Sequence, residues 1–119
     1  MNIPNEAKNI LEKGLIYLGT SDGKLPNVTV TQSGVIISQD ELLICDCQMT
    51  LAKENIKNNP NCVLLAHDND KNIWFKAFGK AEYYSSGKYF DIAKEKQNGS
   101  SYKPKGAIVI KIDKIFKVE

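Results

Sequence analysis

The chain has 119 residues, of which 42% are hydrophobic and 25% are charged, and its net charge at pH 7 is +2. This composition is typical of one folded globular domain and argues against intrinsic disorder. All 16 basic residues are lysine. Arginine is the side chain best suited to paired contacts with phosphate and guanine, so its absence argues against nucleic-acid binding.

The first half of the chain predicts one helix and three strands, the second strand being interrupted at Gly34. An apolar stripe predicts a helix, and Gly14 suggests that this helix ends in a left-handed residue. Asp22 and Gly23 form a typical turn pair, so we expect a hairpin between the first two strands. The helix is expected over residues 5–13, and the strands over 15–20, 26–33 with 35–38, and 42–47.

The second half predicts two helices and four strands. Thr50 is placed to cap the first of these helices, and Pro60 ends it because the residue before a proline avoids helical geometry. Gly79 interrupts the longest strand, which predicts a bulge or the close approach of another backbone. The helices are expected over residues 50–59 and 88–97, and the strands over 62–67, 73–84, 106–113 and 115–118.

Short strands separated by frequent turns, with a few helices between them, are typical of an antiparallel barrel. We therefore expect a mostly β protein, a β-barrel of six to seven antiparallel strands with short peripheral helices. No repeat or linker interrupts the sequence, so residues 1–119 are expected to form a single domain.

The cysteines and the N-terminal sequence bear on the cellular location of the protein. Three cysteines, Cys45, Cys47 and Cys62, cannot all pair in disulfides. No apolar stretch approaches the ~18 residues of a membrane span, and residues 1–6 lack the basic region and apolar run of a secretory signal. We expect a cytoplasmic protein without membrane contact. Structural zinc needs four ligands, and only His67 remains beside the cysteines, so we expect no metal site.

Two short segments are candidates for binding an anionic ligand. The loop over residues 46–49 opens onto a helix that carries Thr50 and Lys53 in its first turn. Free amides at a helix start attract anions, and the helix dipole otherwise disfavours lysine there. Thr29 and Thr31 share one face of a strand. The alternative is that Thr50 only caps the helix, that Lys53 points into solvent, and that the strand threonines are ordinary half-exposed residues.

Taken together and in order, three segments resemble the pyridoxamine 5′-phosphate oxidase-like superfamily. These are Pro26–Val30 after the Asp-Gly turn, Thr50–Pro60, and Phe78–Glu82. The most specific piece is Asn55-Ile56-Lys57-Asn58-Asn59-Pro60, which is similar to the family motif N-(I/L)-x-x-(N/D)-P. The similarity spans nearly the whole chain and is greatest to the small FMN-binding proteins and general-stress flavoproteins.

The resemblance implies an FMN-binding split barrel in which two chains form a homodimer, with non-covalent FMN at the subunit interface. Contacts to the phosphate and ribityl chain would fall on the second strand. Contacts to the flavin ring and phosphate would fall on the loop and helix start, with Asn55 supporting the loop. The implied cofactor-binding residues are Thr29, Val30, Thr31, Cys47, Gln48, Met49, Thr50 and Lys53.

We expect an FMN-dependent oxidoreductase or electron carrier, with no catalytic residue assigned. We do not expect pyridoxamine 5′-phosphate oxidase activity. True members of that enzyme group are longer and hold the substrate phosphate with an arginine-bearing C-terminal segment, whereas this chain contains no arginine. The alternative is a non-catalytic barrel module for haem, a deazaflavin or single-stranded nucleic acid. Trp74, Phe78 and Tyr84 share a strand face and could fill the barrel, stack on the flavin or form a dimer contact, of which the dimer contact is favoured. The one basic–aromatic cluster, which would suit single-stranded nucleic acid, is formed by Trp74, Lys76, Phe78 and Lys80.

Overall fold

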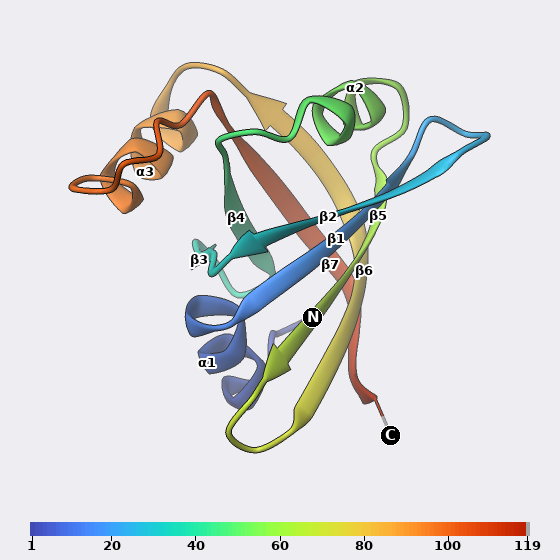
Figure 1. The fold of residues 1–119 in the computed structure, drawn as a ribbon. Helices are drawn as coiled ribbons and strands as arrows, with labels where there is room; N and C mark the ends of the chain where they lie inside the picture. The colour runs from blue at the N-terminus through green and yellow to red at the C-terminus, as the bar shows by residue number, and fades with distance from the viewer. Residues whose placement is uncertain (119) are drawn as a thin grey trace.

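Seven antiparallel strands form one sheet that curls into a half-barrel, with three helices at its two ends (Figure 1). The computed structural model describes residues 1–118. The strand order in the sheet is β2-β1-β5-β6-β7-β4-β3. The elements are α1 (Asn5–Lys13), β1 (Leu15–Ser21), β2 (Pro26–Gln32), β3 (Val35–Ile36), β4 (Glu41–Asp46), α2 (Thr50–Asn58), β5 (Asn61–Asp68), β6 (Ile73–Tyr84), α3 (Lys88–Lys96) and β7 (Gly106–Val118).

The expected mostly β split barrel with peripheral helices is therefore confirmed, and most element boundaries agree within two residues. The Asp22–Gly23 turn joins β1 and β2, which pair from Leu15 with Gln32 to Ser21 with Pro26. Gly23 has a φ of 103°, and this left-handed conformation explains why glycine follows the aspartate. The hairpin forms one edge of the sheet.

Three local predictions were wrong. Gly14 has a φ of −97° and a ψ of 179°, so it is extended, because the chain passes directly from α1 into β1. Glycine is needed there for space, since a Cβ would lie 2.7 Å from the carbonyl oxygen of His67. The N-cap of α2 is Met49 rather than Thr50, and no side chain caps this helix. Residues 106–113 and 115–118 form one continuous strand, β7.

Gly79 was expected to mark a bulge or a close backbone approach, and both are observed. Opposite it, the β6–β7 register shifts so that Phe78 pairs with Lys114 and Gly79 with Ile112. A Cβ on Gly79 would collide with the carbonyl oxygen of Lys111. Asp113 therefore has no partner in this ladder. It is the extra residue of a β-bulge in β7, and the pairing with β6 continues on both sides of it.

The core lies inside the curled sheet and is closed by α1 at one end and α2 at the other (Figure 1). Each inward side chain of β1, β5, β6, β7 and β4 alternates with an outward one, as expected of pleated strands. A second, smaller cluster lies on the outside of β4 and β7, where α3 covers it; its buried members are Leu43, Cys45, Ala93, Ala107 and Val109. The sheet therefore has its outside covered by α3 at one end.

The outside of β2, β1, β5, β6 and β7 is open and rich in apolar side chains, with Lys76, Lys80 and Lys114 among them. The register aligns its side chains in rows across the strands, for example Val30, Tyr17, Leu65, Lys76 and Phe116. Val28 is 69% exposed, Phe78 43% and Phe116 38%. We call this surface the outer face; its apolar members are Leu15, Tyr17, Val28, Val30, Val63, Leu65, Trp74, Phe78, Phe116 and Val118. Within residues 1–118, no helix is long and apolar enough to cross a membrane.

Candidate functional site

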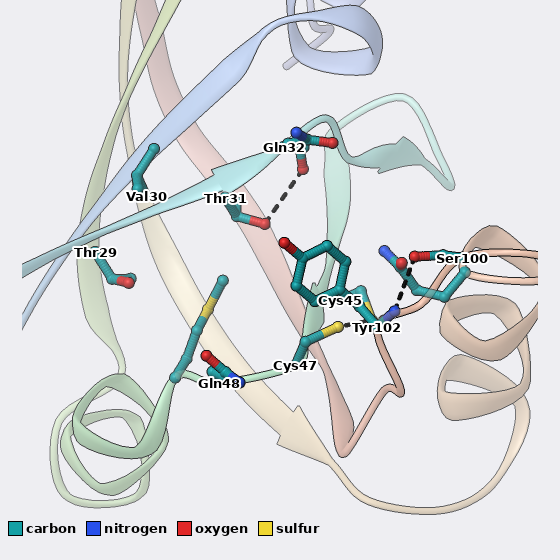
Figure 2. A pocket seen from close by; sticks show the side chains of 11 residues that line it. Thr29, Val30, Thr31, Gln32, Cys45, Cys47, Gln48, Ser100 and Tyr102 are labelled. Carbon is teal, nitrogen blue, oxygen red and sulfur yellow. Dashed lines mark hydrogen bonds between the residues drawn. The ribbon is translucent and has the colours of Figure 1, made fainter.

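A cavity of about 370 Å³ opens at the end of the half-barrel that carries α2 and α3. Its walls come from β2, from the end of β4 with the loop that follows it, and from the segment after α3 (Figure 2). This volume lies within the range of small-molecule sites. We call this cavity the pocket; it is lined by Thr29, Val30, Thr31, Gln32, Cys45, Cys47, Gln48, Met49, Gln97, Ser100 and Tyr102.

The β2 wall follows from strand alternation at the edge of the sheet. Thr29 and Thr31 are half-buried on one side of the strand, whereas Val28 and Val30 are exposed on the other. Strand β2 pairs only with β1, so the pocket lies beside a free strand edge. Val30 belongs both to the pocket and to the outer face, and the two surfaces are therefore continuous.

A buried carboxylate holds the loop between β4 and α2. Asp46 is 2% exposed, and its Oδ1 accepts a hydrogen bond of 2.7 Å from the backbone amide of Met49. The Tyr83 hydroxyl donates to Oδ2 of the same carboxylate. The carbonyl oxygen of Asp46 accepts a 2.7 Å bond from the amide of Lys105. One residue thus ties the loop, β6 and the end of the α3–β7 segment together.

The contact with Asp46 also keeps the Tyr83 hydroxyl protonated. Burial raises the pKa of the Tyr83 hydroxyl, and the hydrogen bond to Asp46 raises it further, so Tyr83 remains a neutral donor. The carboxylate is satisfied by two donors and does not face the pocket as a free acceptor. Sequence reasoning placed Asp46 in the candidate loop but missed its contact with Tyr83, because the two residues lie 37 positions apart.

The start of α2 lies directly after this loop and carries no acidic residue in its first turn. The amide of Lys53 bonds the Met49 carbonyl oxygen at 2.9 Å, so the helix proper begins there and the amides before it are free of helical partners. Thr50 is exposed, and Lys53 places its Nζ 5.1 Å from the centroid of the Tyr83 ring. The helix start is therefore electropositive and open.

A second buried hydrogen bond anchors α2 to the sheet. Asn55 is 7% exposed, and its side-chain amide donates to the Thr20 hydroxyl over 3.1 Å. The bond joins α2 to β1, next to the hairpin that carries Thr29 and Thr31. It fixes the distance between the helix start and the β2 wall of the pocket.

Two cysteine thiols meet in the pocket wall. The Sγ atoms of Cys45 and Cys47 lie 3.6 Å apart (Figure 2). Cys45 is 7% exposed, and burial, followed by the contact with Cys47, raises the pKa of its thiol to about 12. Cys47 is half-buried and lines the cavity beside Gln48.

The third wall comes from the segment that follows α3. Gln97, Ser100 and Tyr102 line the pocket, and the Ser100 hydroxyl accepts a 3.0 Å bond from the amide of Tyr102. Tyr102 is 61% exposed, and Figure 2 shows its ring projecting from this segment over the pocket. An aromatic ring here offers a flat apolar surface to a planar ligand.

The structure brings together most of the residues expected from the sequence. Six of the eight implied cofactor-binding residues line the pocket, namely Thr29, Val30, Thr31, Cys47, Gln48 and Met49. Thr50 and Lys53 lie beyond it, in the first turn of α2. The sequence analysis missed Gln32, Cys45, Gln97, Ser100 and Tyr102. For Cys45 the signal was present, because it shares a strand face with Cys47.

Two other candidates have structural explanations. His67 stacks on Trp74 with ring centroids 3.8 Å apart and hydrogen-bonds Asn72 at 3.0 Å. Within residues 1–118, no three His, Cys, Asp or Glu side chains gather as metal ligands would. Tyr84 is separated from Trp74 and Phe78, because α3 covers it and its ring lies 4.8 Å from that of Tyr89.

Among proteins of known sequence, the uncharacterised protein MJ0282 of Methanocaldococcus jannaschii is 34% identical to the chain over 125 aligned residues. The match covers 100% of this chain and 83% of that protein. No protein-family model matches the chain. The chain is therefore related to this archaeal protein over the whole length of the chain.

Several solved structures have the same fold. HupZ of Group A Streptococcus superposes with a TM-score of 0.88 at 23% identity, covering 98% of this chain and 94% of its own. An FMN-binding protein from Syntrophomonas wolfei gives 0.79 at 20% identity, covering 94% and 81%. A candidate pyridoxamine 5′-phosphate oxidase from Lactobacillus delbrueckii and an F420 reductase give 0.76 and 0.73, each at 17% identity, covering 97% and 96% of this chain.

Proposed function

The chain belongs to the family of the archaeal protein MJ0282 and has the split-barrel fold of the pyridoxamine 5′-phosphate oxidase-like proteins, and on that premise we propose that it binds FMN non-covalently in the pocket. The observation that supports the proposal is that the pocket lies next to the start of α2. Neutral polar side chains line it, and the open start of α2 lies at its rim.

The donor groups present fit each part of this cofactor. The free amides at the start of α2, the Thr50 hydroxyl and the Lys53 ammonium suit a phosphate. The hydroxyls of Thr29 and Thr31 suit the ribityl chain. Gln48 and the loop backbone suit the polar edge of the ring, and the Tyr102 ring suits its flat face. The pocket residues themselves carry no lysine or carboxylate, so the charge for the phosphate comes from α2.

We propose further that the protein is an oxidoreductase or electron carrier whose substrate is not pyridoxamine 5′-phosphate. Bound FMN supplies one- and two-electron transfer. The chain's own residues bind and orient it: Asp46 and Tyr83 hold the loop, and Asn55 holds α2 at a fixed distance from β2. The half-buried pocket limits the access of water to the ring.

The outer face supports the proposal that two copies form a homodimer. It is an apolar surface over five strands, and Phe78 and Phe116 stack on it with centroids 6.3 Å apart. Exposed apolar patches of this kind mark association surfaces. Val30 continues this surface into the pocket, so a second copy bound there would border the cofactor site.

The test is a titration of the purified chain with FMN, followed by quenching of flavin fluorescence and by thermal melting. We expect saturation at one FMN per chain and a rise in Tm, because a ligand that binds only the folded state stabilises it. Thermal melting with haemin, a deazaflavin or a single-stranded oligonucleotide in place of FMN tests the alternative that the protein is a non-catalytic binding module for one of these ligands. Stabilisation by one of these, with none by FMN, would replace the proposal by that alternative.

A second measurement separates cofactor binding from redox function. The FMN-loaded protein is mixed anaerobically with NADH or NADPH, and loss of the yellow colour is followed. Bleaching by either nicotinamide supports an oxidoreductase. If dithionite alone bleaches the protein and added one-electron acceptors restore the colour, an electron carrier is favoured instead.

A further inference from the structure

Cys45 and Cys47 are the one pair of thiols in contact among residues 1–118. Their Sγ atoms lie 3.6 Å apart, whereas Cys62 contacts the backbone of β6 through the carbonyl oxygen of Gly79. A buried cysteine is most often a small apolar residue. Two thiols that meet in the wall of an open cavity are a different arrangement, because a small molecule can reach one and the other can reach it in turn.

The two thiols are not equivalent. Both thiols line the pocket, but Cys47 is half-buried, while Cys45 is only 7% exposed and belongs to the cluster beneath α3. Burial raises the pKa of Cys45 to about 12, and thiol exchange proceeds through the thiolate. Cys47 is therefore the more accessible thiol, and Cys45 is placed to attack the Cys47 sulfur.

Cys47 lies beyond the hydrogen-bonded part of β4. Strand β4 ends at Asp46, whose last ladder partner is Gly106, so Cys47 lies just outside the ladder in a bend. A disulfide has an S–S bond of about 2.05 Å. The sulfurs are 3.6 Å apart, and Cys47 pairs with no strand, so a movement that closes this gap at Cys47 breaks no ladder hydrogen bond.

We propose that Cys45 and Cys47 form a redox-active dithiol that exchanges with low-molecular-weight disulfides entering the pocket. In the first step the Cys47 thiolate attacks one sulfur of the disulfide, whose S–S bond breaks; a mixed disulfide forms and one thiolate leaves. Cys45 then attacks the Cys47 sulfur, its proton passing to the second departing thiolate. The protein loses two electrons, and the small disulfide becomes two thiols.

This proposal does not depend on FMN, and its test uses the purified chain as isolated, reduced and desalted. The protein is incubated with oxidised glutathione, acidified, treated with N-ethylmaleimide after denaturation, and weighed intact. For the wild type we expect a mass lower by about 2 Da before alkylation and one maleimide instead of three, without a lasting glutathione adduct. Reduction with dithiothreitol should restore all three alkylations.

Single variants make the order of attack visible. Cys45→Ser should keep a stable adduct of about 305 Da on Cys47, because the resolving thiol is gone. Cys47→Ser should gain neither adduct nor disulfide, since Cys45 is buried. Cys62→Ser is the matched control: it should also become about 2 Da lighter without a lasting adduct, and should then take up no maleimide, because its remaining two cysteines are joined. Thermal melts verify that each variant is folded, and Cys45→Ala replaces Cys45→Ser if a buried hydroxyl prevents folding.

Two results would overturn the proposal. One is a wild type that keeps glutathione on Cys47 as long as Cys45→Ser does. The other is a wild type that retains three free thiols under conditions in which Cys45→Ser takes up the adduct. Either result would leave the FMN titration unaffected, so failure of the dithiol and failure of flavin binding are distinguishable.

Discussion

The Tyr83 hydroxyl donates a hydrogen bond to the Asp46 carboxylate, joining the C-terminal end of β6 to the loop that opens onto α2. The other oxygen of Asp46 accepts the amide of Met49. A buried carboxylate costs folding free energy unless donors surround it. Here both donors are present, and the loop conformation at the pocket is the result.

Removing the Tyr83 hydroxyl should loosen this loop. We predict that Tyr83→Phe lowers the free energy of unfolding by about 1.5–3 kcal/mol, the range for a hydrogen bond to a charged group, and weakens FMN binding. Urea denaturation and FMN titration measure the two effects. Tyr84→Phe is the matched control, because its hydroxyl bonds the exposed Glu82. Equal effects in the two variants would contradict the role given to Asp46.

The start of α2 should supply the charge for the phosphate. We predict that Lys53→Glu combined with Thr50→Val lowers FMN affinity about tenfold or more, which corresponds to about 1.4 kcal/mol. Riboflavin, which has no phosphate, should be affected much less. Lys57→Glu is the control, since it makes the same change of charge at the exposed far end of α2. Unchanged FMN affinity in the double variant would refute the phosphate assignment.

A charge on the outer face should prevent dimerisation. Phe116 is 38% exposed and stacks with Phe78, so Phe116→Glu would replace an apolar ring by a carboxylate in the proposed interface. We predict a monomer at concentrations where the wild type sediments as a dimer. Leu25→Glu, at a 72% exposed position in the β1–β2 turn, should leave the dimer intact. A monomeric wild type would exclude the homodimer at once.

The stability of the fold should fall in alkaline solution. Burial raises the pKa of the Cys62 thiol from 9.0 to about 12. Above pH 9 the unfolded chain releases this proton while the folded chain keeps it, so the contribution is complete below pH 9 and is lost as the pH rises to about 12. Cys62→Ala should make the slope shallower by at most about 1.4 kcal/mol per pH unit.

Urea denaturation at a series of pH values measures this slope without added ligand. Cys62→Ser provides the control for side-chain volume, because it should show the same shallower slope at a different absolute stability. A slope identical to that of the wild type in both variants would show that the Cys62 thiol ionises at the same pH in the folded and unfolded chains.

Most elements could be predicted from the sequence because their signals are local. The alternation around Gly79 and the Asp22–Gly23 turn each lie within a few residues, and β6 begins and ends where the pattern indicates. The errors at Gly14 and Thr50 have a different origin. The path of the chain beyond Gly14 is set by the β1–β5 pairing, and the loop before α2 is held by the hydrogen bond from the Met49 amide to Asp46.

The pocket could be predicted only in part, for the same reason. Its β2 and loop residues lie in segments with motifs, and the resemblance identified them. Ser100 and Tyr102 lie in a polar loop without a pattern of its own, and only the packing of α3 against β4 and β7 brings that loop to the pocket. The contact of Tyr83 with Asp46 likewise depends on the β6–β7–β4 strand order, which no short-range signal specifies.

The three walls of the pocket differ in how firmly the fold holds them. Two belong to the sheet, but residues 98–105 have no regular secondary structure, and the bond from Lys105 to Asp46 is what fastens their far end. Such stretches open locally long before the whole molecule unfolds. This stretch is therefore the wall that can open while the sheet stays intact. Amino-acid replacements in it can alter release rates while the barrel keeps its melting temperature.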